Sequence, residues 1–163
     1  MTITTAILKD KEQILDILYE IAVYLKSKQI TQWQEWLAPE KTDLEWIEHL
    51  IKDDNFYLIK EKNSTVGIFS LSDKDDKYWG KSIEKSKYLH SLAILPHYKN
   101  QQFGKNVIDL LKLNLKEKNY TFLRLDCISS NQKLKQYYLN QEFNEVGVTN
   151  IGVNSFTLFQ YIL

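Results

Sequence analysis

The sequence predicts one α/β domain of the α+β kind, built on a mixed sheet with helices on its faces. Segments with strand and helix periodicity follow the order strand, two helices, three strands, helix, strand, helix, two strands. A strand, a helix and a strand follow one another between Tyr88 and Cys127, which implies a right-handed crossover and a parallel strand pair. The 163 residues contain two prolines, five glycines and no repeat or linker, so we expect a single domain over residues 1–163.

The first third of the chain predicts a strand and two helices. Residues 2–8 have strand character, and Asp10 can cap a helix whose apolar residues recur every three or four positions. These apolar residues are Ile14, Ile17, Leu18, Ile21, Ala22 and Leu25. The run Thr42–Glu45 has the capping-box pattern and predicts a second helix that begins there. Residues 29–37 lie between the two helices and form a loop or a short helix.

The middle of the chain predicts three strands. Residues 55–61 and 65–71 are apolar and rich in β-branched or aromatic side chains, and the short polar segment between them predicts a hairpin. Residues 72–87 are charged and irregular and predict a long exposed connection, in which Asp73–Lys77 is a solvated loop. Residues 88–95 return to strand character and stop at a proline, which cannot extend a ladder.

The last third predicts two helices and three strands. A helix begins at Gln102, and its apolar residues are spaced by four: Phe103, Val107, Leu111 and Leu115. Residues 122–127 predict a strand, residues 131–140 a helix, and residues 143–148 and 155–162 the closing antiparallel strands.

The composition excludes several classes of partner. Lys plus Arg equal Asp plus Glu, 21 against 21, so no long-range field draws the chain to nucleic acid or to an anionic membrane. No run approaches the ~18 apolar residues that cross a bilayer, and the first residues lack the pattern of a signal peptide. The one cysteine, Cys127, excludes an internal disulfide and suits a reducing compartment. We therefore expect a cytoplasmic protein with no nucleic-acid or membrane partner.

The stretch from Leu92 to Ile108 is the most informative about chemistry. A strand ends at a proline, a polar loop follows, and a helix begins near Gly104. Unpaired backbone N–H groups converge at the positive end of such a helix, where a pyrophosphate can bind. Lys99 and Lys105 add positive charge on either side. Junctions of this kind are also common in proteins without a ligand there, so a purely structural interpretation stays open.

The same stretch resembles the acyl-CoA motif of the GNAT superfamily, in which a strand ending in Leu-Ala-Val is followed by a proline, a tyrosine and Arg/Gln-x-x-Gly-x-Gly/Ala. The matching residues are Leu92, Ala93, Ile94, Pro96, Tyr98, Lys99 in the basic position and Gly104 as the last glycine. A second family motif, a strand followed by Asn-x-x-Ala/Leu-x-x-Tyr-Tyr and Gly-Phe, is matched by Leu123–Cys127, Asn131, Leu134, Tyr137, Tyr138 and Phe143. The departures are Gln102 for the first glycine, Glu142 for the glycine before Phe143, and Lys99 for an arginine or glutamine.

This resemblance implies an acetyltransferase that moves an acetyl group from acetyl-CoA directly to a primary amine of a small molecule, without a metal. It implies a GNAT-like, mostly antiparallel sheet with helices on both faces, whose central parallel strands splay apart after a bulge near Ala93. The main chain of Leu92 and Ile94 would bond the pantetheine arm, and the Ile94 N–H would polarise the thioester carbonyl. The pyrophosphate would bind the loop formed by Lys99, Asn100, Gln101, Gln102, Phe103, Gly104 and Lys105.

Two residues of the second motif carry implied roles toward the cosubstrate. Asn131 would hydrogen-bond the CoA arm, and a helix N-cap is the alternative. Tyr138 would face the CoA sulfur and donate a proton to the leaving thiolate. For this tyrosine the alternative is half-buried packing, which is also the role expected of Tyr137.

The attacking amine must lose a proton, and His90 titrates in a range suited to accept it. Asp126 and Glu84 are rival bases, and a purely structural role for His90 is the alternative. Cys127 is expected to be a buried packing residue rather than a nucleophile.

Trp33 and Trp36 lie where this family forms its acceptor pocket, and their rings suit an apolar or cationic amine. Core packing of these two residues is the alternative. Two other functions stay open. One is a protein or peptide N-acetyltransferase; the other, suggested by Gln102, is a non-catalytic acyl-CoA-binding regulatory domain. The terminal strands are also consistent with a homodimer.

Overall fold

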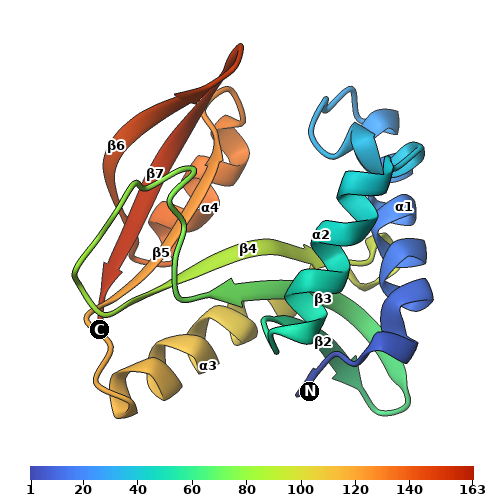
Figure 1. The fold of residues 1–163 in the computed structure, drawn as a ribbon, viewed down its shortest axis with the longest axis horizontal. Coiled ribbons are helices and arrows are strands. Elements are labelled where there is room, and N and C mark those ends of the chain that lie inside the picture. The colour runs from blue at the N-terminus through green and yellow to red at the C-terminus, as the bar shows by residue number, and fades with distance from the viewer. The chain divides into compact units, whose positions relative to one another are not determined.

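A computed structural model describes all 163 residues and contains a seven-stranded mixed sheet with four α-helices (Figure 1). The strands are hydrogen-bonded in the order β1-β2-β3-β4-β5-β7-β6. Their bounds are β1 Thr2–Thr5, β2 Phe56–Glu61, β3 Ser64–Ser72, β4 Ser86–Ile94, β5 Phe122–Ile128, β6 Asn144–Ile151 and β7 Asn154–Ile162. The helices are α1 Lys11–Ser27, α2 Lys41–Lys52, α3 Phe103–Glu117 and α4 Gln132–Asn140. This order of elements, with one parallel pair among antiparallel neighbours, confirms the predicted fold class.

The residues group into two compact units. The first consists of Met1–Ser70 and Ser91–Gly104, and the second of Leu71–His90 and Lys105–Leu163. Strands β3 and β4 each contribute residues to both units. The single domain expected over residues 1–163 stays a prediction. None of the helices combines the length and the apolar character that crossing a membrane requires.

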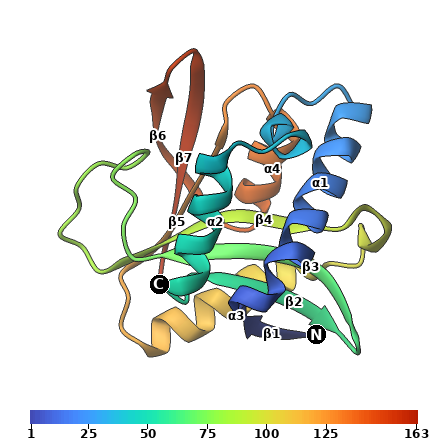
Figure 2. The same cartoon turned by 45° about the vertical axis from the view of Figure 1, so that its right-hand side comes forward.

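The first unit packs two helices against a β-meander. Strand β2 pairs antiparallel with β1 and with β3, and Glu61↔Ser64 closes the hairpin that the sequence predicts. Figure 2 shows α1 and α2 on the same side of these strands. The core between them is formed by one apolar stripe of each helix and by alternate residues of the strands: Ile14, Ile17, Leu18, Ile21, Ala22, Ile47, Ile51, Phe56, Leu58 and Ile68. This stripe contains five of the six residues that the helical spacing marked in α1, and the sixth, Leu25, packs against it half-buried.

Two predicted boundaries in this unit are wrong. The first strand ends at Thr5 instead of Leu8, because Leu8–Asp10 form a short 3-10 helix in which the Ile7 N–H donates to the Asp10 carboxylate at 2.9 Å. Helix α2 begins at Lys41 instead of Thr42. The Glu40 N–H donates to the Asp43 carboxylate at 2.8 Å, so the two acidic residues do the capping that the pattern Thr42–Glu45 suggested.

The second unit contains the parallel pair and the closing hairpin. Strand β4 runs parallel to β5 from Ser86↔Phe122 to Leu89↔Leu125, as predicted. Strand β7 pairs antiparallel with both β5 and β6. The β6–β7 turn is two residues long and begins with Gly152, whose φ of +59° is the left-handed conformation that such turns require. Helix α4 follows β5 directly and lies beside β5 and β7 (Figure 1).

Candidate active site

The candidate residues are distributed over both units. Leu92, Ile94, the loop from Lys99 to Gly104, and the tryptophans Trp33 and Trp36 belong to the first unit. His90, Lys105, Asn131 and Tyr138 belong to the second.

The end of β4 in the first unit is held closely against β3. The Leu95 N–H donates to the Val66 carbonyl at 2.9 Å. Gly67 has no room for a side chain, because an added Cβ would lie 2.3 Å from the Ala93 carbonyl oxygen. The backbone irregularity expected near Ala93 is found two residues earlier, at Ser91, whose φ is +54°. A non-glycine residue with this φ is strained, and it lies two residues after Leu89, the last β4 residue of the parallel register.

The loop between β4 and α3 contains two residues in the left-handed region. Pro96–Tyr98 form a 3-10 turn, and then Asn100 and Gln102 have φ of +62° and +61°. Alternation of left-handed and ordinary residues turns successive backbone N–H groups toward one side and makes anion-binding concavities. Gln102 keeps the conformation that the family's glycine would adopt freely, at a cost of roughly 1 kcal/mol. The sequence shows the missing glycine but not this backbone angle.

The two lysines at this loop already have partners within the protein. The Lys99 ammonium lies 3.8 Å from the centre of the Tyr24 ring of α1. Its hydrogen bond to the phenol, together with its charge, lowers the pKa of Tyr24. Lys105 pairs with Asp109 one turn further along α3, with both side chains exposed. Exposed pairs of this kind contribute little stability and can exchange for a phosphate.

Asn131 is the N-cap of α4. Its Oδ1 accepts a hydrogen bond from the Leu134 N–H at 3.1 Å, which confirms the N-cap interpretation. Its predicted contact with the CoA arm stays a prediction.

Tyr138 lies in α4 among aromatic side chains. It is buried, with ring centres 5.4 Å from Tyr137, 6.0 Å from Phe143 and 5.7 Å from Phe159. Burial raises the pKa of the Tyr138 phenol far above its usual value, and Cys127, Tyr137 and Asp126 raise it further. The hydroxyl therefore stays protonated near neutral pH and cannot serve as a general base. Burial likewise raises the pKa of Tyr137 to about 12.

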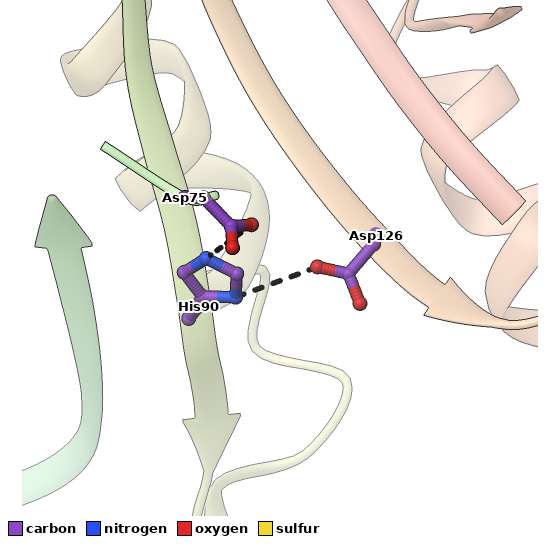
Figure 3. A group of neighbouring side chains, drawn as sticks. All are labelled: Asp75, His90 and Asp126. Atoms are coloured by element: carbon purple, nitrogen blue, oxygen red, sulfur yellow. Dashed lines mark ion pairs between the residues drawn. The ribbon is translucent and has the colours of Figure 1, made fainter. Parts of the chain in front are cut away.

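The second unit also contains a half-buried cluster of Asp75, His90 and Asp126 (Figure 3). The His90 Nε2 lies 3.1 Å from the Asp75 Oδ2, and its Nδ1 lies 3.4 Å from the Asp126 Oδ2. The carboxylate side chains are only 6% and 9% exposed. His90 belongs to β4, Asp126 to β5 and Asp75 to the segment that connects β3 and β4.

The pKa values of His90 and Asp126 are both shifted in this cluster. Burial lowers the pKa of His90, but the close contact with the Asp75 carboxylate and the charges of Asp126 and Asp75 outweigh it, so the pKa is raised. Burial raises the pKa of Asp126 to about 6, although His90 opposes the shift. The neighbouring carboxylates therefore favour the charged form of the His90 imidazole.

Asp75 is the residue that the sequence analysis missed. The prediction that Asp73–Lys77 is a solvated loop is wrong for Asp75, because its side chain turns inward. Its other carboxylate oxygen accepts the Tyr78 N–H at 3.2 Å, and its carbonyl accepts the Trp79 N–H at 2.9 Å. These bonds form a local turn, for which an aspartate in a polar segment is the only sequence signal.

The rival base Glu84 is already engaged. It accepts a hydrogen bond from Arg124, and this bond lowers the pKa of its carboxyl group. Arg124 also donates to Ser82 at 3.0 Å and lies 4.9 Å from the Trp79 ring. These contacts attach the β3–β4 connection to β5 and make Glu84 a structural ion-pair partner.

The structure agrees with core packing, the alternative for Trp33 and Trp36, and it confirms the packing role expected of Cys127; the predicted place of the two tryptophans in an acceptor pocket stays a prediction. Trp36 is buried, and its ring centre lies 6.2 Å from that of Trp46. Trp33, at φ +65° before the 3-10 helix Gln34–Leu37, is half-buried against the same core. Cys127 is buried, and burial raises its pKa to about 12, so it is not a thiolate nucleophile at neutral pH.

Comparisons with known proteins agree with this geometry. A model of the acetyltransferase (GNAT) family matches residues 18–143. The chain is 25% identical over 156 residues to a Bacillus subtilis (strain 168) protein named "Uncharacterized N-acetyltransferase YesJ", covering 93% of this chain and 86% of that one. A crystal structure of a GNAT-family acetyltransferase from Listeria monocytogenes 4b F2365 matches with a TM-score of 0.82 at 28% identity, covering 99% and 94% of the two chains.

The PaiA N-acetyltransferase of Thermoplasma acidophilum, solved in complex with coenzyme A, has the same fold, with a TM-score of 0.72 at 17% identity over 98% of each chain. The family match spans most of the present sequence. The chain therefore belongs to the GNAT family and is one of its N-acetyltransferases.

Proposed function

We propose that this chain transfers the acetyl group of acetyl-CoA to a primary amine of a small molecule, by direct attack in a ternary complex. The observation that carries the proposal is the loop before α3, where Asn100 and Gln102 are both left-handed in a chain of the GNAT family. Backbone N–H groups in this arrangement, at the positive end of a helix, suit the pyrophosphate of the cosubstrate. Lys99 and Lys105 would exchange their present partners for its oxygens.

In the proposed reaction the amine nitrogen attacks the thioester carbon and the carbon–sulfur bond breaks. The main chain of Leu92 and Ile94 bonds the pantetheine amides, and the Ile94 N–H polarises the carbonyl oxygen. Tyr138 gives its proton to the departing sulfur. The phenol is protonated at neutral pH and so has a proton to give, which supports the role.

The proton lost by the amine enters the cluster of Asp75, His90 and Asp126. The two carboxylates favour the charged form of His90, and this residue links them and positions them. Asp126, whose pKa is about 6, is ionised at neutral pH yet basic for a carboxylate, and it accepts the proton.

The setting that we propose is a homodimer in the cytoplasm, with no metal ion in the reaction. The buried free thiol of Cys127 and the balanced charge of the chain support a reducing compartment and no polyanionic partner. Strand β6 is at the edge of the sheet, with Val146 and Val148 exposed, which supports pairing between copies. Analytical ultracentrifugation tests the dimer.

Calorimetry with acetyl-CoA, followed by transfer assays on an amine panel, tests the function. We expect saturable binding and release of free CoA with small primary amines. Faster turnover of a lysine-containing peptide than of every small amine would identify a peptide acetyltransferase. Binding without turnover on any amine would identify an acyl-CoA-binding domain and refute the proposed reaction.

A further inference from the structure

The geometry points to an ammonium-binding site formed by Asp75, His90 and Asp126, which selects acceptors that have no carboxylate beside the amine. The role of this site in catalysis depends on the proposed function, whereas its occupation by an ammonium ion can be measured without turnover.

The first observation is that the cluster contains hydrogen-bond acceptors without donors. The Oδ2 atoms of Asp75 and Asp126 are both buried, and neither accepts a hydrogen bond. Each faces a nitrogen of His90 at ion-pair distance, 3.1 Å and 3.4 Å, with unfavourable hydrogen-bond geometry. A buried carboxylate oxygen without a donor is costly, and an ammonium group supplies three donors.

The net charge of the cluster favours binding of a monovalent cation. Two carboxylates and one imidazolium leave one negative charge in a buried position. Lys77, in the same connecting segment, contributes a weaker and exposed positive charge, with its ammonium 5.3 Å from the Tyr78 ring. The remaining titratable groups near Asp126 are Cys127 and Tyr138, and both stay neutral. An ammonium ion therefore brings the site to neutrality.

A divalent metal ion is the alternative occupant. One ligand atom from each of the three residues lies within 4.8 Å of the others. However, Asp75 faces Nε2 and Asp126 faces Nδ1, so the carboxylates lie at opposite nitrogens of the ring (Figure 3). An ion bound to one ring nitrogen at about 2.1 Å would require a carboxylate to move before both could coordinate it. The longer hydrogen bonds of an ammonium group suit this separation better.

Neighbouring contacts keep the site in place and give it an apolar wall. The Tyr78 ring lies 5.9 Å from His90 and meets Phe156 edge to face at 5.0 Å. The turn that holds Asp75 belongs to the segment that Arg124 attaches through Ser82 and Glu84. An alkylamine can therefore present its charge to the carboxylates and its carbon chain to the aromatic rings.

The negative charges of Asp75 and Asp126 disfavour the binding of amino acids. A substrate with a carboxylate on the amine-bearing carbon would bring a third negative group against Asp75 and Asp126 in a buried site, where like charges repel strongly. Butylamine and norvaline differ only by this carboxylate. We expect the wild-type kcat/KM for butylamine to exceed that for norvaline by at least about tenfold.

The test compares wild type, Asp75→Asn and the exposed neighbour variant Asp76→Asn. Asparagine at position 75 keeps the oxygen that accepts the Tyr78 N–H, so the turn is retained. Calorimetry measures binding of butylammonium chloride in the presence of CoA, and separate titrations use zinc chloride and magnesium chloride. NMR of 15N-labelled histidine reports the His90 ring, and steady-state assays with butylamine and norvaline give kcat and KM.

We expect Asp75→Asn to weaken butylammonium binding and to raise the KM for butylamine about tenfold, with a smaller change in kcat. The ratio of kcat/KM for butylamine to kcat/KM for norvaline should fall in this variant. Butylammonium should shift the His90 resonances in wild type and in Asp76→Asn. Binding without acetyl transfer would leave the site standing and refute the proposed function. Three results would overturn the ammonium site. The first is acetyl transfer that Asp75→Asn does not change, and the second is absence of butylammonium binding. The third is binding of zinc or magnesium, in place of butylammonium, that depends on Asp75.

Discussion

Replacing Asp126 by asparagine should change how the stability of the protein depends on pH. Burial raises the pKa of this carboxyl from its ordinary 3.8 to about 6, so the folded protein binds a proton there that the unfolded chain has lost. The stabilisation from this proton is complete below pH 3.8 and disappears as the pH rises through about 6. A change of this size corresponds to about 3 kcal/mol between the two ends of the window. The asparagine side chain of the variant does not titrate, so the variant does not lose this stabilisation as the pH rises.

The assay is urea unfolding of wild type and Asp126→Asn at several pH values between 4 and 6.5. We expect the difference in unfolding free energy, variant minus wild type, to grow by about 2 kcal/mol in favour of the variant across this pH range. The substitution also removes the Asp126 charge that helps to raise the pKa of His90, and the resulting lower pKa changes the difference in the same direction. The exposed Asp16→Asn is the control and should show a constant difference. A pH-independent difference for Asp126→Asn would refute the buried, high-pKa carboxyl.

Three further substitutions test the other parts of the site. Tyr138→Phe should lower kcat about 100-fold with an unchanged acetyl-CoA Kd, measured by steady-state kinetics and calorimetry; equal turnover would remove the proton-donor role. Gly67→Ala should destabilise the fold by about 2 kcal/mol and weaken acetyl-CoA binding, because the new Cβ would meet the Ala93 carbonyl at 2.3 Å. The control Gly147→Ala, whose new Cβ has its nearest neighbour at 3.9 Å, should leave binding unchanged. Gln102→Val should weaken acetyl-CoA binding about tenfold, because a β-branched residue resists φ of +61°, and Gln102→Gly should bind at least as tightly as wild type; the reverse order would contradict the role of this backbone angle.

The order of the elements could be predicted because periodicity reports which residues are buried. The apolar stripe of α1 and the β2–β3 hairpin are of this kind, and both are confirmed. Exact ends could not be predicted in the same way, because they depend on local competition between similar caps. At α2 the chain uses Glu40 and Asp43, although the pattern beginning at Thr42 offered an equally good start.

The candidate site could be predicted only in part. The sequence motifs identify Tyr138 and the loop around Gln102, since their spacing along the chain is fixed. Asp75 could not be assigned to the site, because its burial depends on contacts between distant segments, such as the one between Glu84 and Arg124. His90 and Asp126 were separate rivals in the sequence, and their mutual pairing appears only when β4 and β5 lie side by side.

The most direct test of the account is to identify the product. Acetyl-CoA carrying a 13C-labelled acetyl group is incubated with butylamine and the protein, and the amine is analysed by mass spectrometry. The account predicts labelled N-butylacetamide, formed at a rate proportional to protein concentration and greatly reduced in Tyr138→Phe. Intact acetyl-CoA and unmodified amine, with the cosubstrate shown to be bound, would contradict it.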